Sequence, residues 1–231
     1  MMKSPIILAL DTKDIDLAQK WILACLDRVD HFKVGLEFYL QHGPAGIERL
    51  RQVAEFNLFL DLKLYDIPNT VKGAVESVAK LSPKFLTVHA AGGKKMISEA
   101  AKALPNGSIT AVTVLTSFSE EDFSSMGNTQ SIEKTTISWA NLALQSGATS
   151  LVCSPFEVSA LRKLSSNAVL ITPGVRVEGD DVGDQVRVMS PKDALSEGAD
   201  FVVIGRSITK LWDGSDLKMR GKIELISNTL A

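Results

Sequence analysis

Residues 58–70 read LFLDLKLYDIPNT, an apolar run that is interrupted by two charges and followed by a turn with a proline. Side chains of a β-strand alternate between its two faces, so Asp61 and Lys63 are expected on one face and Leu60, Leu62 and Leu64 on the other. The leucines suit a face that helices cover. This stretch therefore predicts a strand with helices packed on one face and an Asp–Lys pair on the opposite face.

Short apolar runs of the same kind recur along the whole chain and alternate with amphipathic stretches of helical period. The eight runs span Pro5–Leu10, Phe32–Gly35, Leu58–Leu64, Phe85–His89, Ile109–Leu115, Ser150–Cys153, Val169–Thr172 and Phe201–Ile204. The helical stretches between them include Thr70–Leu81, Lys94–Leu104, Ile132–Ser146 and Lys192–Gly198. Alternating strands and helices predict a parallel sheet. Eight units in this length, with no GxGxxG motif after the first strand, favour an α/β fold closed into a single (β/α)8 TIM barrel domain over residues 1–231.

The composition favours a small-molecule partner. The 231 residues are 45% hydrophobic, enough for one sizeable core, and 25 basic residues nearly balance 27 acidic ones. No block of like charge predicts binding to nucleic acid or to an anionic membrane surface. Cys25 and Cys153 lie far apart in the sequence and predict neither a redox pair nor a zinc site. The apolar run Ile6–Leu10 is too short for a signal peptide and no run reaches membrane-spanning length, so a cytoplasmic location is expected.

Polar residues lie within, end or follow most of the predicted strands. They are Asp11, Lys33, His89, Thr116, Arg176 and the pair Gly205-Arg206. In a barrel these positions gather at the carboxyl-terminal rim, where the active sites of this architecture lie. Asp61 and Lys63 would point into the barrel near the same rim. A structural ion pair is the alternative, but apolar side chains fill a barrel interior at lower cost, so a functional pair is favoured.

The pattern Asp61-x-Lys63-x-x-Asp66, followed by Ile67-Pro68-Asn69-Thr70-Val71, is similar to the catalytic signature of the orotidine 5′-monophosphate decarboxylases, of their bacterial branch in particular. Further matches span nearly the whole chain: Ala9-Leu10-Asp11, Phe32-Lys33-Val34-Gly35, Val88-His89-Ala90-Ala91-Gly92-Gly93, Thr113-Val114-Leu115-Thr116-Ser117, Thr172-Pro173-Gly174-Val175-Arg176, Asp184-Gln185-Val186-Arg187 and Ile204-Gly205-Arg206. Tyr65 departs from the family pattern, which has a histidine there; that histidine is not among the family's chemical residues.

The resemblance implies decarboxylation of orotidine 5′-monophosphate without a metal or an organic cofactor. It assigns to Lys63 the stabilisation and protonation of a carbanion at ring carbon 6, and to Asp61 a place beside the departing carboxylate. Whether Asp61 acts by repulsion in the ground state or by orienting the lysines stays open. Lys33 and Asp66 would complete an alternating chain of four charges.

The resemblance also implies where the rest of the nucleotide and the partner subunit lie. Asp66, Ile67 and Thr70 would reach into the partner's site, which implies a homodimer. Asp11 and Lys33 would hold the ribose, helped across the interface by Asp66 and Thr70, and Thr116 would contact the pyrimidine edge. The phosphate would lie on Arg206, the Gly205 backbone, Gln185 and, more weakly, Arg176. Residues 173–191 are long for a barrel connection and predict a lid that Gln185 closes, with a disordered surface loop as the alternative.

Two other functions fit a barrel of this kind. One is that of a 3-keto-gulonate-6-phosphate decarboxylase or hexulose-phosphate synthase, which shares the Asp-x-Lys-x-x-Asp strand but uses magnesium and sugar phosphates; residues 67–70 and 184–187 argue against it. The other is that of a non-catalytic barrel that binds phosphorylated metabolites or serves as a scaffold, which needs no lysine aimed at a ring carbon. For His89, a neutral side chain that braces neighbouring loops is favoured over a catalytic one.

Overall fold

Eight parallel strands form a closed barrel in the computed structural model, which describes residues 4–177 and 189–229. Each strand pairs with the next in the sequence, and the last pairs with the first. The strands are β1 (Ile6–Ala9), β2 (His31–Gly35), β3 (Asn57–Leu64), β4 (Phe85–His89), β5 (Ser108–Val112), β6 (Ser150–Val152), β7 (Val169–Thr172) and β8 (Phe201–Ile204). The predicted (β/α)8 barrel is confirmed.

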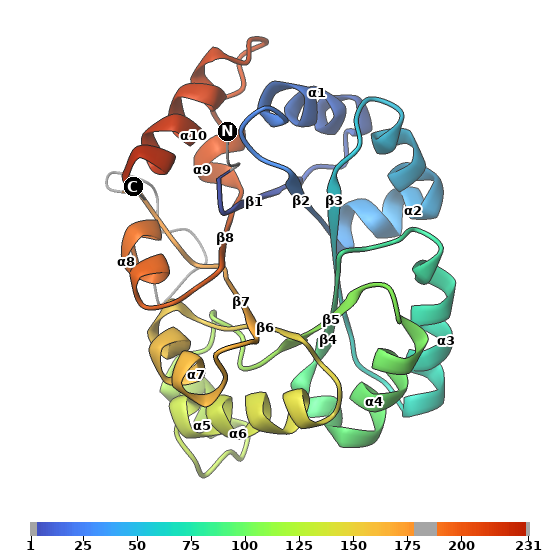
Figure 1. Cartoon of the computed structure of the whole chain (residues 1–231), viewed down its shortest axis with the longest axis vertical. Helices are drawn as coiled ribbons and strands as arrows, with labels where there is room; N and C mark the ends of the chain where they lie inside the picture. Colours follow the sequence, from blue (N-terminus) through green and yellow to red (C-terminus); the bar gives the residue numbers. More distant parts are fainter. Residues whose placement is uncertain (1–3, 178–188, 230–231) are drawn as a thin grey trace.

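Helices surround the ring of strands (Figure 1). They are α1 (Ile15–Cys25), α2 (Leu36–Arg51), α3 (Pro68–Ala79), α4 (Gly93–Ala103), α5 (Glu120–Ser125), α6 (Ile132–Gln145), α7 (Val158–Leu164), α8 (Pro191–Ser196), α9 (Arg206–Thr209) and α10 (Leu217–Thr229), with short 3-10 turns η1 (Ala90–Gly92) and η2 (Pro155–Glu157). Pro68 at the start of α3 needs no intrahelical amide bond, which explains why the helix begins there.

Strand β5 is shorter than the sequence predicts. The apolar run continues to Leu115, but the strand ends at Val112. Val114 instead packs against Phe123 and Ile132 in a small cluster between the rim and helices α5 and α6. The predicted strand end was wrong because burial beneath helices and burial within a sheet give the same apolar sequence.

The barrel has a layered interior and an outer core beneath the helices. Ile7, Phe59, Phe85 and Ile171 pack together inside the barrel. Residues adjacent to them in the strands, such as Leu86, belong to the larger cluster that the helices cover. Alternation along the strands therefore separates an interior layer from the helix-facing core, as expected for a barrel of this type.

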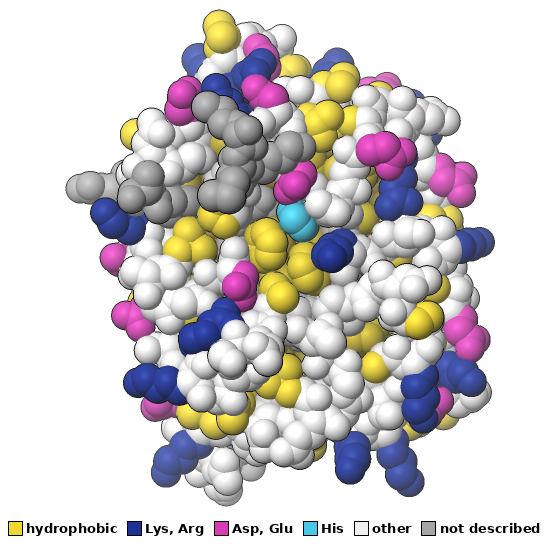
Figure 2. All heavy atoms as spheres, in the orientation of Figure 1, with side chains coloured by type: hydrophobic (Ala, Val, Ile, Leu, Met, Phe, Trp, Pro, Cys, Tyr) yellow, Lys and Arg dark blue, Asp and Glu magenta, His cyan; other side chains and the backbone are white. Residues whose placement is uncertain are grey.

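The surface carries mixed charges. On the face in Figure 2, basic and acidic side chains are interspersed and form no single-sign stripe. Cys25 and Cys153 are free and buried, and burial, with a further contribution from Asp27, raises the pKa of the Cys25 thiol to about 12. Among the described residues, no helix is both long and apolar enough to cross a membrane.

Candidate active site

Strand β3 is irregular at the point where its two charges lie. Leu60 pairs with Leu86 and Leu64 pairs with Val88, so three residues of β3 lie opposite the single residue Thr87 of β4. Within this bulge Lys63 adopts a left-handed backbone conformation, with φ of 47°. Bulges re-aim side chains and are common beside active sites. The Asp61 and Lys63 side chains do meet, but through this bulge rather than through a regular strand.

A line of alternating charges crosses three neighbouring strands. The Lys33 ammonium on β2 lies 2.9 Å from Asp11 Oδ1, after β1, and 3.8 Å from Asp61 Oδ2 on β3. The Lys63 ammonium lies 2.8 Å from both Asp61 carboxylate oxygens. The side chains of Lys33 and Asp61 are each only 12% exposed, and that of Lys63 is 31% exposed. Asp61 thus lies between two ammonium groups in a largely desolvated position.

The neighbouring charges favour the ionised forms of Asp61 and Lys33. Burial acts to raise the pKa of Asp61, but Lys33, then Lys63, and a hydrogen bond from Thr87 together lower it below its ordinary value. Burial acts to lower the pKa of Lys33, but Asp11 and Asp61 together raise it above its ordinary value. At neutral pH the Asp61 carboxylate and the Lys33 ammonium are therefore both charged.

A cavity of about 220 Å³ opens directly beside these charges. Its charged wall consists of Lys33, Asp61 and Lys63. The remaining wall is largely apolar and is made by Phe59, Val112, Val114, Leu115, Thr116, Ser117, Val152, Pro173 and Val203. A flat ring can lie against the apolar wall while a charged substituent meets the ammonium groups. Such a low-dielectric pocket strengthens electrostatic contacts with whatever charge develops inside it.

Several residues predicted for the site gather here, while two others lie further along the rim. Thr116 is buried in the cavity wall. Gly205 lies close to Asp11, because a Cβ atom at that position would come within 3.5 Å of Asp11 Oδ2 and 3.3 Å of Ala9 Cβ. Arg206 is exposed and begins helix α9. Arg176 donates a hydrogen bond to the carbonyl of its neighbour Val175 at 2.8 Å and does not line the cavity. Gln185, and the predicted lid over residues 178–188, lie outside the described residues.

The predicted intersubunit residues lie on an exposed stretch. Asp66 accepts a hydrogen bond from the Ile67 amide at 2.6 Å and forms no ion pair with any residue of the described chain. The Ile67 side chain is 66% exposed, and Thr70 is also exposed. Within one subunit the chain of charges thus runs from Asp11 to Lys63 and does not include Asp66. The position of Asp66 in a partner's site stays a prediction.

Two side chains near Lys63 add features that the motifs did not assign. Tyr65, the departure from the family pattern, packs against His89 in a tilted arrangement, with 5.7 Å between ring centroids and 54° between the ring planes. Burial, and secondarily Lys63, lowers the pKa of His89, which favours its neutral form. Thr87 is fully buried and hydrogen-bonded to both Asp61 and Lys63. Alternation between Phe85 and His89 could have indicated that Thr87 faces the interior.

Among the described residues, no group of three or more His, Cys, Asp or Glu side chains is arranged to hold a metal ion. The charged wall also contains no cluster of ring nitrogens or thiolates. Its chemistry is that of ammonium groups and carboxylates, which can bind, stabilise charge and transfer protons.

Comparison with known proteins agrees with this geometry. Residues 4–214 match the family model for the "Orotidine 5'-phosphate decarboxylase / HUMPS family". The orotidine 5′-phosphate decarboxylase of Thermobifida fusca is 49% identical over 213 residues, which cover 92% of this chain and 91% of that protein. The one from Wolbachia pipientis subsp. Culex pipiens is 44% identical over 90% of this chain and 92% of its own length. The crystal structure of orotidine 5′-phosphate decarboxylase from Lactobacillus acidophilus superposes with a TM-score of 0.82 at 33% identity and covers 99% of both chains. The chain therefore belongs to the orotidine 5′-phosphate decarboxylase / HUMPS family.

Proposed function

We propose that this chain catalyses the decarboxylation of orotidine 5′-monophosphate to uridine 5′-monophosphate and carbon dioxide, the last step of de novo pyrimidine nucleotide synthesis, without a metal or an organic cofactor. Relatives at 40–49% identity carry the name of this activity. The observation that carries the proposal is the Lys33–Asp61–Lys63 line of charges on the wall of an otherwise apolar cavity. That arrangement suits a reaction whose main difficulty is a developing negative charge.

The reaction breaks one carbon–carbon bond and forms one carbon–hydrogen bond. As the bond to the carboxylate breaks, the electron pair stays on ring carbon 6 and carbon dioxide leaves. The Lys63 ammonium stabilises this carbanion and then donates a proton to it, which leaves a neutral amine that solvent reprotonates. Asp61 holds the Lys63 ammonium at 2.8 Å and lies beside the departing carboxylate. Asp61 can act by repelling that carboxylate or by orienting Lys33 and Lys63.

The rest of the nucleotide would be held by the rim around this centre. Asp11 and Lys33, already paired at 2.9 Å, are suited to the ribose hydroxyls. Thr116 in the cavity wall is suited to the polar edge of the pyrimidine. Arg206 would bind the phosphate together with the Gly205 backbone, Gln185 and Arg176. A glycine at position 205 suits this arrangement, because a Cβ atom there would come within 3.3 Å of Ala9 Cβ.

We further propose a cytoplasmic homodimer in which Asp66, Ile67 and Thr70 complete the partner's site. The exposure of Ile67 and the lack of an ion pair for Asp66 among the described residues of its own chain support this assignment. In a two-fold dimer each subunit offers the same patch, so two identical shared sites would result.

Mixing of two inactive variants tests the shared site. Lys63→Ala and Asp66→Asn proteins should each be inactive alone. A mixed dimer would contain one doubly altered site and one site with both native residues. With free exchange of equal amounts, about half of the dimers are mixed, so activity should recover to roughly a quarter of the wild-type value. Mass tagging of one variant must first demonstrate exchange; exchange without recovery would show that Asp66 serves its own subunit.

The activity itself is tested by the absorbance of the orotate chromophore. Mixing the protein with orotidine 5′-monophosphate should lower that absorbance, and a chelator should not slow the change. Inhibition by the chelator, or turnover of a sugar phosphate instead, would favour the magnesium-dependent enzymes of the same barrel type. Binding of the nucleotide without any loss of absorbance would favour a non-catalytic barrel.

A further inference from the structure

Thr87 lies between the two features that set the geometry of the site, which are the left-handed backbone at Lys63 and the Asp61–Lys63 ion pair. It is the residue of β4 that lies opposite the three-residue bulge of β3, and it is fully buried. Its hydroxyl oxygen accepts a hydrogen bond from the Lys63 amide at 2.8 Å. The same hydroxyl donates to Asp61 Oδ1 at 3.0 Å. One side chain thus contacts the backbone of Lys63 and the carboxylate that holds its ammonium.

The first of these bonds replaces one that the bulge removes. In a regular parallel ladder, strand amides donate to carbonyl oxygens of the neighbouring strand. At Lys63 the amide donates to a side-chain hydroxyl instead. A positive φ is strained for a residue with a Cβ atom and persists only where the surroundings hold it. The Thr87 hydroxyl is one such constraint, because it fixes the direction of the Lys63 amide.

The second bond fixes Asp61 in the same way. A hydroxyl carries a single proton, so a hydroxyl that donates to Asp61 presents only lone pairs to the Lys63 amide. Asp61 Oδ1 also accepts from the Lys63 ammonium at 2.8 Å. The charged or hydrogen-bonding groups around this carboxylate are Lys33 from β2, Lys63 from β3 and the Thr87 hydroxyl from β4. The titratable His89 ring, also on β4, interacts with Asp61 electrostatically. Of these hydrogen-bonding groups, the Thr87 hydroxyl is the uncharged donor.

We propose that Thr87 is a positioning residue, whose hydroxyl holds the Lys63 backbone and the Asp61 carboxylate so that the Lys63 ammonium is presented to the cavity. This inference rests on the proposed role of Lys63 in decarboxylation. It does not require Thr87 to touch the substrate, and Thr87 is not among the residues that line the cavity.

The test compares Thr87→Val with a matched control, Thr110→Val. Thr110 pairs in register with Thr87 on the next strand, is equally buried, and forms a 2.6 Å hydrogen bond with Ser150 rather than with the charged groups. Both substitutions remove one buried hydroxyl and keep the side-chain shape. We expect Thr87→Val to lower kcat by about tenfold to a hundredfold, as for loss of a hydrogen bond to a charged group. KM and the affinity for uridine 5′-monophosphate should change little, and Thr110→Val should keep the wild-type kcat.

Rescue and pH dependence distinguish positioning from a general effect on the fold. Thr87→Ser retains the hydroxyl and should restore most of kcat. In Thr87→Val the acid limb of kcat/KM should move to higher pH, because a hydrogen bond that favours the ionised Asp61 is lost. Equal kcat losses in Thr87→Val and Thr110→Val, or no rescue by serine, would overturn the proposal.

Two further outcomes are decisive. If Thr87→Val and Thr87→Ala both fail to fold while Thr110→Val folds, Thr87 serves the fold and the proposal is wrong. If the wild-type protein itself does not decarboxylate orotidine 5′-monophosphate, the proposed function fails. In that case hydrogen exchange still tests whether the Thr87 hydroxyl holds the Lys63 amide. Exchange of that amide should be faster in Thr87→Val than in Thr110→Val.

Discussion

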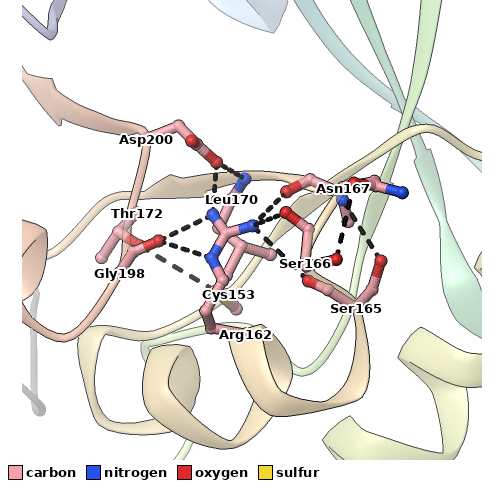
Figure 3. Close-up of polar contacts among 10 residues, drawn as sticks. Cys153, Arg162, Ser165, Ser166, Asn167, Leu170, Thr172, Gly198 and Asp200 are labelled. Atoms are coloured by element: carbon pink, nitrogen blue, oxygen red, sulfur yellow. Dashed lines mark hydrogen bonds and ion pairs between the residues drawn. The ribbon is translucent and has the colours of Figure 1, made fainter.

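Charged side chains make different kinds of contact at the two ends of the barrel. At the amino-terminal end, Arg162 of α7 donates hydrogen bonds to the carbonyls of Gly198 and Ser166 and to the Asp200 carboxylate (Figure 3). It also donates to the Ala168 carbonyl at 2.9 Å. Asp200 also accepts a hydrogen bond from the Leu170 amide at 2.7 Å. This guanidinium joins the loops before β7 and β8. All of these Arg162 hydrogen bonds join the guanidinium to other residues of the chain.

At the carboxyl-terminal end, the ammonium groups of Lys33 and Lys63 contact carboxylates and also line a cavity. Each ammonium carries three protons, and both lysines contact carboxylates while they also line the cavity. The Arg162 guanidinium, which is hydrogen-bonded to two loops, holds those loops together. The Lys33 and Lys63 ammonium groups, which line a cavity, can also contact a ligand. This agrees with the division of barrels into a stability face and an active-site face.

The largest expected effect is at the carboxyl-terminal end. Lys63→Ala should lower kcat by about 10⁴-fold or more, because it removes the group that we propose as the proton donor and as the charge that stabilises the carbanion. The free energy of unfolding should change by no more than about 1 kcal/mol, since the lysine is partly exposed. Turnover is followed by orotate absorbance and stability by urea unfolding. Near-normal turnover would show that Lys63 at the carboxyl-terminal end does not carry out the reaction. Retained binding of uridine 5′-monophosphate without turnover would support its role.

The second prediction concerns Arg206, the residue proposed to bind the phosphate at the same end of the barrel. Arg206→Ala should lower kcat/KM for the nucleotide by about a hundredfold or more, because binding energy from a remote phosphate can be expressed in the transition state. The low activity on the phosphate-free nucleoside should hardly change. Steady-state kinetics on both substrates measure this contrast. Equal losses on the two substrates would show that Arg206 acts on the reacting ring or on the fold.

Much of this division could be predicted from the sequence. Apolar runs at Phe85–His89, Val169–Thr172 and Phe201–Ile204 matched their strands, because strands buried on both faces have few polar interruptions. Polar residues at strand ends indicated the rim, and Asp61 and Lys63 were expected to meet. These features depend on local periodicity, which a single sequence records directly.

Other features depend on how strands are aligned, which the sequence does not record. Period-two alternation gives no sign of the left-handed φ at Lys63, because the bulge arises from the register between β3 and β4. The role of Thr87 follows from that register and was missed for the same reason. Arg162 was missed because most of its partners are backbone carbonyls, which have no sequence signature. Asp66 could be assigned only through the family resemblance, because the contacts expected for it lie in another subunit.

The third prediction uses pH to compare stability at the active-site face. Asp61→Asn should lower the free energy of unfolding at pH 7 by about 3 kcal/mol, because two neighbouring ammonium groups lose a buried counter-ion. The Asp61 pKa is lowered on folding, so its stabilising contribution is fully present above the ordinary value of about 3.9 and is lost as the pH falls through the folded value. Urea unfolding at pH steps from about 7 down to about 2 should therefore show a constant difference between the two proteins above the ordinary pKa and a shrinking difference below it. A difference that stays constant over the whole range would mean that the carboxylate's charge is not what stabilises the fold.

The smallest expected effect is at the amino-terminal end, where Arg162→Met removes the guanidinium but keeps much of the apolar stem. We expect a loss of about 2 kcal/mol in the free energy of unfolding, because several carbonyl groups lose a charged donor but remain close enough to the surface for water to replace it. The value of kcat should stay within about twofold of wild type, since residues far from each other usually do not influence each other's contributions.

Asp200→Asn is the matched control. Its amide oxygen can still accept from the Leu170 amide, and the Asp200 side chain is 42% exposed, so loss of its charge should cost under about 1 kcal/mol. If Asp200→Asn costs as much as Arg162→Met, the ion pair rather than the set of carbonyl contacts joins these loops. If Arg162→Met lowers kcat as strongly as a change at the rim, the two ends of the barrel are coupled, and the division between a stability face and an active-site face does not hold for this protein.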